Sequence, residues 1–321
     1  MKSAVEILKR LKRAADAAWQ RMKMRCEAAK AYRYDRKRFF ANAGALHPGR
    51  RDAAIAGIVM AYHVIEKGLT MPRRRLGFGA GAVRNLVRLV TGYERKFGDG
   101  AWQVVHASRV LKAYRVMHAD WPEPMPVLDA FLASHPGLEP ACEPHVTREE
   151  FFAKKDAPFA QFAASRHVCR HFAAPAPRET LERALAIAAT APSACNRQHA
   201  CARLVDDRAV MERLFELQRG TRGFGSDAGA VFVVVSKLDA IRWAWERHDV
   251  YVNGGIYALN LCYALHHLGV AHCILHWSVP PSVDRAARKL LSLPDGEEIV
   301  CLVACGLPPP EFDIAASPRR G

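Results

Sequence analysis

The sequence predicts a mixed fold of α+β or α/β type in the C-terminal half, preceded by an all-helical N-terminal region. Helical periodicity without a convincing alternating strand fills about the first 140 residues, whereas helices alternate with short apolar runs further on. Prolines and glycines at 135–146 interrupt the periodicity just before a candidate capping box, Thr147-Arg148-Glu149-Glu150. We therefore divide the chain into residues 1–145 and residues 146–321.

The first element is a basic amphipathic helix. Its apolar residues recur every three or four positions and form one stripe: Ala4, Leu8, Leu11, Ala15, Trp19, Met22 and Cys26. Residues 1–40 hold 13 Lys and Arg against 4 Asp and Glu, in a chain of formal net charge +15. Clustered cations favour contact of residues 1–40 with an anionic surface, although a solvated helix face is the simpler interpretation. We expect no specific nucleic-acid partner.

Further elements follow from the hydrophobic periodicity. Helices are predicted at 50–67, 80–97, 101–118, 126–134, 178–191, 207–218, 248–268 and 281–292. Strands are predicted at 201–206, 229–236, 270–276 and 298–305. The helix at 248–268 is apolar on nearly every side, which predicts a buried, central position.

Composition and cysteine usage narrow the class of protein. No apolar stretch approaches the roughly 18 to 20 residues that a membrane span needs, and the basic N-terminus lacks the apolar core of a secretory signal. Nine scattered cysteines without a CxxC pair favour a reducing compartment, so we expect a cytoplasmic location. Cys301 and Cys305 lie in an apolar run and are interpreted as core residues; no metal site is predicted.

Two short segments carry candidate chemistry. Residues 165–172 place two arginines and two histidines within eight positions, a cluster that can hold a phosphate and an electron-rich ring. Residues 191–198 form an irregular turn after an Ala-rich helix, where Asn196 and Gln198 offer donors and acceptors to the edge of a heteroaromatic ring. Taken singly, each segment has a simpler explanation, namely a solvated basic loop and an ordinary helix stop.

In order and spacing, these segments resemble the nitroreductase family, whose usual pattern is Ser-Arg-Arg/His-Ser-x-Arg-x-Phe followed by Ala-Pro-Ser-x-x-Asn-x-Gln-Pro. The resemblance runs from about residue 151 to the C-terminus and includes Asn253-Gly254-Gly255 and Cys305-Gly306-Leu307-Pro308. It implies an α/β/α sandwich around a mostly antiparallel sheet. It also implies an intertwined homodimer with FMN at the interface, for which the helix at 248–268 is the natural core.

The resemblance also implies a cofactor site. Its residues are Arg166, His167, Val168, Arg170, Pro192, Ser193, Asn196, Gln198, His276, Trp277, Ser317 and Arg319. The first basic cluster would surround the FMN phosphate and the pyrimidine side of the flavin, and Arg319 with Ser317 would complete the phosphate site. Asn196 and Gln198 would address the ring and its ribityl chain, while the backbone around His276 and Trp277 would face flavin N5.

Three residues depart from the family pattern. Val168 stands where a Ser usually touches phosphate, Cys195 where Gly is common, and His199 where Pro is common. Losing the hydroxyl donor removes about 1 kcal/mol, which the arginines can offset. The implied activity is NAD(P)H-linked hydride transfer through FMN to a small-molecule electron acceptor, without a catalytic side chain. The alternative is an inactive binding protein of the same fold that docks through its basic N-terminal helix.

The helical half has a signature of its own, residues 63–72 followed by Gly77-Phe78-Gly79. It resembles the N-terminal extension of a nitroreductase subgroup from bacterial polysaccharide gene neighbourhoods. His63 and Glu66, at i and i+3, have the spacing of metal ligands, but no second such pair is present, so a structural or substrate-lining role is favoured. The glycine run follows no strand and is not a dinucleotide fingerprint.

Overall fold

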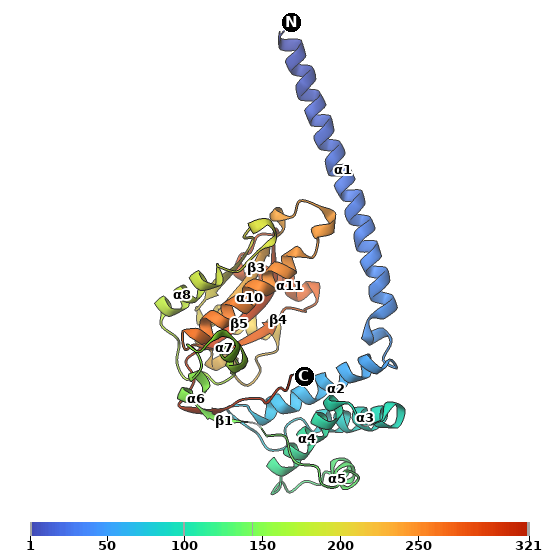
Figure 1. Ribbon diagram of the computed structural model, residues 1–321, viewed down its shortest axis with the longest axis vertical. Coiled ribbons are helices and arrows are strands. Elements are labelled where there is room, and N and C mark those ends of the chain that lie inside the picture. The colour runs from blue at the N-terminus through green and yellow to red at the C-terminus, as the bar shows by residue number, and fades with distance from the viewer. Residues whose placement is uncertain (1, 99, 143, 320–321) are drawn as a thin grey trace.

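Two parts of different architecture meet in the chain, as Figure 1 shows. The computed structural model describes residues 2–98, 100–142 and 144–319. The first part is helical and the second combines helices with two sheets, which confirms the predicted helical front and mixed second half.

The helical part is a small bundle with one long helix leading into it. Its elements are α1 (Lys2–Asn42), η1 (Gly44–Leu46), α2 (Arg51–Leu69), α3 (Ala80–Phe97), α4 (Trp102–Met117) and α5 (Pro126–Ala133). α2 to α5 share a core that includes Ile58, Leu86 and Leu111. α1 continues well beyond the predicted stripe because no Gly or Pro interrupts the sequence before Gly44.

The second part contains the four predicted strands and helices on both sides of them. In chain order its elements are β1 (His145–Thr147), α6 (Arg148–Phe152), α7 (Phe159–Ser165), α8 (Arg178–Ala188), η2 (Ala194–Asn196), β2 (Ala200–Val205), α9 (Arg208–Gln218), η3 (Gly225–Asp227), β3 (Ala230–Lys237), η4 (Leu238–Ala240), η5 (Ala244–Glu246), α10 (Asp249–His267), β4 (Ala271–His276), α11 (Pro281–Leu291), β5 (Glu297–Gly306) and β6 (Glu311–Asp313). The Thr147–Glu150 capping box forms as predicted and opens α6.

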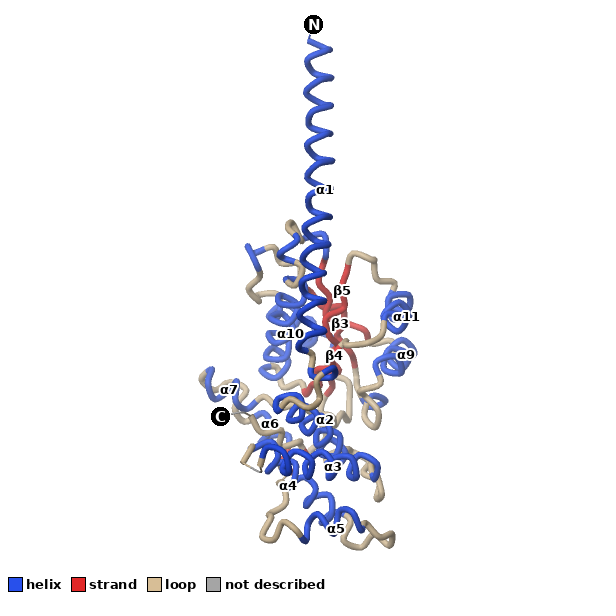
Figure 2. The backbone as a smooth tube through the Cα atoms, turned by 90° about the vertical axis from the view of Figure 1, so that its right-hand side faces the viewer, coloured by secondary structure: helices blue, strands red, loops and turns tan. Residues whose placement is uncertain are grey.

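The main sheet has the order β2-β3-β5-β4, and neighbouring strands are antiparallel throughout. The side chains of β3 are buried on both faces of the sheet and alternate between them: Phe232 and Val234 face the α8 and α10 side, whereas Val231 and Val233 face α9 and α11. Figure 2 shows α10 on one side of the strands and α9 with α11 on the other. The predicted α/β/α sandwich with a mostly antiparallel sheet is therefore confirmed.

A two-stranded sheet brings the C-terminal tail back to the helical part. β1 pairs antiparallel with β6, and the next residue, Ile314, donates its N–H to the carbonyl of Pro144 at 2.9 Å. The sequence analysis missed both strands, since three residues are too few to show an alternation. From β6 the chain runs on along α2, where Ser317 contacts Glu66.

Polar contacts join the two parts around the end of α2. Lys67 Nζ donates to the carbonyl of Gly220 at 2.6 Å, and His171 Nε2 donates to the carbonyl of Thr70 at 2.7 Å. Beyond α2, Arg73 pairs with Asp227 at 2.9 Å. These contacts place the C-terminal end of α2 against the sandwich.

The helix α10 is buried on one face only. Its inner face, which includes Tyr257, Leu261 and Leu265, packs on the sheet. Its outer face exposes apolar side chains: Tyr251 (52%), Val252 (57%), Ile256 (38%) and Leu259 (48%). The sequence pattern predicted burial on nearly every side, and a single chain does not provide it.

We expect Gly254→Ala to lower the free energy of unfolding by about 1 to 3 kcal/mol, because a Cβ there would lie 2.4 Å from Val300 Cγ2 on β5. The matched control is Gly92→Ala on α3, where nothing lies within 4 Å, and this change should raise stability by about 0.5 to 1 kcal/mol. Denaturant unfolding measures both. Equal effects would contradict a close helix-to-sheet approach at Gly254.

Candidate functional site

A cavity of about 420 Å³ lies where the helical part, the edge strand β4 and the C-terminal tail meet. Its lining residues are Val59, Tyr62, His63, Glu66, Trp102, Gln103, His167, Val168, Arg170, Ile274, Ala315, Ser317, Pro318 and Arg319. Five of the twelve sequence-predicted cofactor residues are thus brought together: His167, Val168, Arg170, Ser317 and Arg319. The volume falls within the range of about 300 to 1,000 Å³ for small-molecule sites.

One wall of the cavity is basic. Arg170 has a buried Nε that has no hydrogen-bond partner within the described part of the chain. Burial, together with the nearby charges of Arg166 and Arg319, lowers the pKa of His167. A buried guanidinium nitrogen without a partner, beside a second arginine, is suited to an anionic ligand, which guanidinium groups bind through paired hydrogen bonds.

The cavity lining also contains a buried carboxylate, that of Glu66 on α2. His106 Nε2 donates to Glu66 Oε1 at 3.2 Å, and His63 Nδ1 lies 3.6 Å from Oε2. Burial alone would raise the pKa of Glu66, but the hydrogen bonds from His106, His63 and the Ser317 N–H outweigh it and lower the pKa to about 2. The carboxylate is therefore ionised at neutral pH.

Glu66 holds the C-terminal tail in place. The backbone N–H of Ser317 donates to Oε1 at 3.0 Å, and its hydroxyl donates to Oε2 at 3.3 Å. Ser317 has a φ of 39°, and its carbonyl accepts a hydrogen bond from Arg319 at 3.3 Å. Because the folded-state pKa of Glu66 is depressed, these contacts stabilise the structure above pH 4.5 and weaken as the pH falls toward 2.

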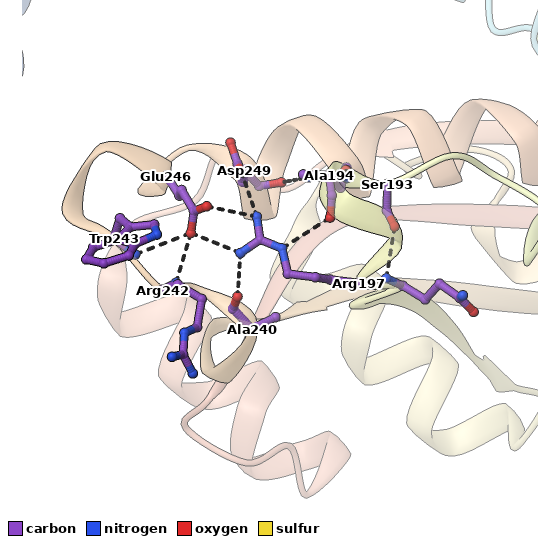
Figure 3. Close-up of polar contacts among 10 residues, drawn as sticks. Ser193, Ala194, Arg197, Ala240, Arg242, Trp243, Glu246 and Asp249 are labelled. Atoms are coloured by element: carbon purple, nitrogen blue, oxygen red, sulfur yellow. Dashed lines mark hydrogen bonds and ion pairs between the residues drawn. The ribbon is translucent and has the colours of Figure 1, made fainter.

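The turn at residues 192–198 is organised by an arginine that the sequence analysis gave no role. Figure 3 shows the Arg197 guanidinium at the centre of this network. Arg197 donates to both carboxylate oxygens of Glu246 (2.9 and 3.1 Å), to Asp249 (3.3 Å) and to the carbonyl of Ala240 (2.7 Å). Its Nε also donates back to the carbonyl of Ala194 at 3.1 Å. The turn is thereby fixed to the segment that leads into α10.

The backbone of this turn is strained. Cys195, Asn196 and Gln198 have φ values of 51°, 53° and 50°, in the left-handed region that favours glycine. This explains why Gly suits position 195, where the family pattern has it. Such strain persists only when surrounding contacts hold it, as Arg197 does here, and it is commonest at ligand-binding positions.

In a single chain the turn does not reach the cavity. Residues 192–198 are all described, and none of them lines it. The turn leads into β2 at one edge of the sheet, while the cavity borders β4 at the other edge, three strand spacings or about 14 Å away. Pro192, Asn196 and Gln198 are exposed, whereas the Ser193 hydroxyl accepts a hydrogen bond from the Gln198 N–H.

The remaining predicted residues also lie outside the cavity lining. Arg166 follows α7, and its charge, after burial, helps to lower the pKa of His266 to about 4 and that of His272 to about 3. His276 ends β4 with an exposed ring, and its carbonyl accepts from Gln218 at 3.1 Å. Trp277 donates its indole N–H to Asp284 at 2.9 Å.

No cysteine is among the described residues that line the cavity. All nine cysteines are free, and burial raises the pKa of Cys169 to about 12, which keeps it a thiol. Cys301 and Cys305 are buried in β5 within the core shared with α10. Among the described residues, no group of three His, Cys, Asp or Glu side chains is arranged to hold a metal ion. No described helix is long and apolar enough to span a membrane.

Residues 163–221 match the model of the nitroreductase family. This range contains both segments that carry the sequence resemblance.

Solved structures similar to the chain include an FMN-dependent nitroreductase from Clostridium difficile R20291, with 20% identity, coverage of 49% of this chain and 91% of that chain, and a TM-score of 0.42. A nitroreductase family protein from Clostridium difficile 630 has 22% identity, coverage of 51% and 90%, and a TM-score of 0.42. TM-scores below 0.5 add nothing to the family-model match. No curated protein sequence matches the chain.

Within the residues that match the family model, we expect Cys195→Gly to raise the free energy of unfolding by about 0.5 to 1 kcal/mol, because glycine adopts the left-handed conformation without a Cβ clash. Ala194→Gly is the control in the same turn, since it gains backbone entropy in the unfolded state without relieving a positive φ, and it should destabilise by about 0.5 to 1 kcal/mol. Urea unfolding of both variants decides the matter, and a loss of stability in both would argue against strain at position 195.

Proposed function

We propose that the chain is an FMN-dependent oxidoreductase of the nitroreductase type, which passes electrons from NAD(P)H to a small-molecule acceptor. The observation that carries this proposal is the cavity that gathers His167, Arg170 and Arg319 beside the family-matched segment. FMN supplies the hydride-transfer chemistry when bound, and the protein binds and orients it. Nine free cysteines support a cytoplasmic setting for this reaction.

The residues present fit the proposed cofactor. A flavin phosphate is a dianion, and Arg170 Nε is a buried donor that still lacks an acceptor. Apolar and aromatic side chains on the same cavity, including Val59, Tyr62 and Ile274, suit a flat ring system. Val168 lines the cavity in place of a hydroxyl donor, so the arginines carry the anion contacts.

A homodimer forms part of this proposal, with the turn of one chain completing the cavity of the other. Two observations support it. The turn's polar residues Asn196 and Gln198 are exposed and lie too far from the cavity of their own chain. The outer face of α10 exposes a row of apolar side chains, Val252, Ile256 and Leu259, that a second copy would bury.

The deciding experiment is the visible absorption spectrum of the purified, desalted protein, before and after excess FMN and then NAD(P)H. Flavin bands that stay with the protein and bleach on reduction are expected. A protein that retains no flavin when the excess FMN is removed by a second desalting step would contradict the proposal. It would favour the alternative of an inactive binding protein that docks through its basic N-terminal helix.

Replacing Arg170 or Arg319 with Ala should raise the dissociation constant of FMN about tenfold or more, because each change removes a charge-assisted contact to phosphate. Riboflavin lacks the phosphate and should bind each variant as it binds the unaltered protein. The control is Arg213→Ala, which removes an exposed arginine paired with Glu216 on α9. Fluorescence titration measures all three, and equal losses for FMN and riboflavin would refute the phosphate assignment.

Glu66→Ala should also weaken FMN binding about tenfold, because the tail that carries Arg319 loses its anchor at Ser317. Riboflavin binding should change less. Glu94→Ala is the matched control, since it removes another Glu–His contact of the helical part, that with His135 at 3.2 Å, away from the cavity. If both substitutions weaken FMN binding equally, Glu66 acts through the stability of the bundle and not through the tail.

A further inference from the structure

The long helix α1 is largely uncovered by the rest of the chain. Every side chain from residue 4 to residue 23 is exposed, and Figures 1 and 2 show this end of the helix projecting beyond the sandwich. The exposed side chains include large apolar ones: Leu8 is 66% exposed, Leu11 62% and Trp19 60%. A helix this exposed gains little stabilisation from packing against the rest of its own chain, which implies an external partner.

Only one face of α1 packs on the body. Its partly covered positions between residues 20 and 35 are Met24, Glu27, Ala28, Ala31 and Asp35. Asp35 receives two hydrogen bonds from the Arg247 guanidinium, at 2.5 and 2.7 Å, which lowers its pKa to about 2. This contact fixes the rotation of the helix about its own axis.

The apolar stripe lies on the opposite face. At about 100° per residue, the stripe from Ala4 to Cys26 falls in one sector, roughly half a turn away from Met24, Ala31 and Asp35. The body therefore cannot cover the stripe while the Asp35–Arg247 contact is made. The stripe faces outward along the flank of the molecule.

Basic side chains flank the stripe. Arg25 borders one side of it, with Arg21 further round the helix, and Lys12 and Lys30 border the other side. No acidic residue of the helix lies within the stripe: Glu6, Glu27 and Asp35 lie on the far side, which also carries Lys9, Arg10 and Arg13, and Asp16 lies between the two. Long basic side chains that flank an apolar face reach anionic headgroups while the apolar face enters the headgroup and acyl boundary.

We propose that α1 docks in the plane of an anionic lipid bilayer through this stripe, with the body held on the opposite side of the helix. Leu8, Leu11 and Trp19 insert, and the flanking arginines and lysines contact lipid phosphates. A second copy of α1 is disfavoured as the partner of the stripe, since pairing two stripes would bring like charges together along both edges; the homodimer proposed above uses α10 and not this stripe. Nucleic acid would use the cations but not the apolar row.

The test is cosedimentation of the full chain with vesicles of phosphatidylcholine alone and of phosphatidylcholine mixed with phosphatidylglycerol. Binding to the mixed vesicles only is expected, and it should weaken as salt is added. Failure to bind the mixed vesicles at low salt would overturn the proposal. Flavin retention is measured separately, so either proposal can fail without the other.

Two substitutions that each add one negative charge distinguish insertion of the stripe from electrostatic attraction of the helix to the vesicle surface. Leu11→Glu lies in the stripe and should lower the vesicle partition coefficient about tenfold or more. Ala17→Glu lies on the same face as Asp35 and should lower it much less. Both positions are exposed, so neither change disturbs the core, and a thermal melt confirms this.

Three other outcomes would each refute docking to lipid through the stripe. Equal losses for the two variants would mean that net charge alone drives binding. A Leu11-dependent rise in molecular mass in solution, without vesicle binding, would assign the stripe to a second copy. Tight binding of single-stranded RNA, unaffected by Leu11→Glu and without vesicle binding, would assign the helix to nucleic acid.

Discussion

The buried carboxylate of Glu66 is the interaction on which the candidate site depends. An ion is costly to bury without partners, and removing one partner of a buried charge costs more than the contact contributes. Here the compensation comes from three places in the sequence: two histidines of the helical part and the backbone of Ser317 in the tail. The helical part thus determines where Arg319 lies, and the cavity belongs to both parts of the chain.

Regular elements could be predicted from the sequence, because burial on one face imposes a period that is visible over ten or more residues. The periodic stretch at 80–97 became α3 in this way, whereas the run at 229–236 was recognised as β3 by its continuous apolar character, since it is buried on both faces. β1 and β6 could not be predicted, since three-residue strands carry no readable period. α1 was predicted too short, because the apolar stripe on which the prediction rested ends at Cys26.

Residues of the candidate site could be predicted where they cluster within a short stretch of sequence. They could not be predicted where the site depends on tertiary contacts. The resemblance at residues 165–172 led to His167 and Arg170, which line the cavity. Glu66 offered only an i, i+3 spacing with His63, which fits a metal ligand as well as a buried anchor. Its role depends on His106, 40 positions further along the chain, and on Ser317, 251 positions away, pairings that no local pattern contains.

The segment that leads into α10 connects α1 to the strained turn at residues 192–198. Arg247 binds Asp35 of α1, and its neighbour Glu246 binds Arg197, which holds residues 192–198 in their left-handed conformation. Glu246 and Arg247 are consecutive residues, so one stretch of backbone carries both ion pairs. The side chains of Arg197 and Arg247 are only 18% and 15% exposed, and partly buried pairs are screened less by solvent than exposed ones. The segment that leads into α10 therefore ties both α1 and the strained turn to the sandwich.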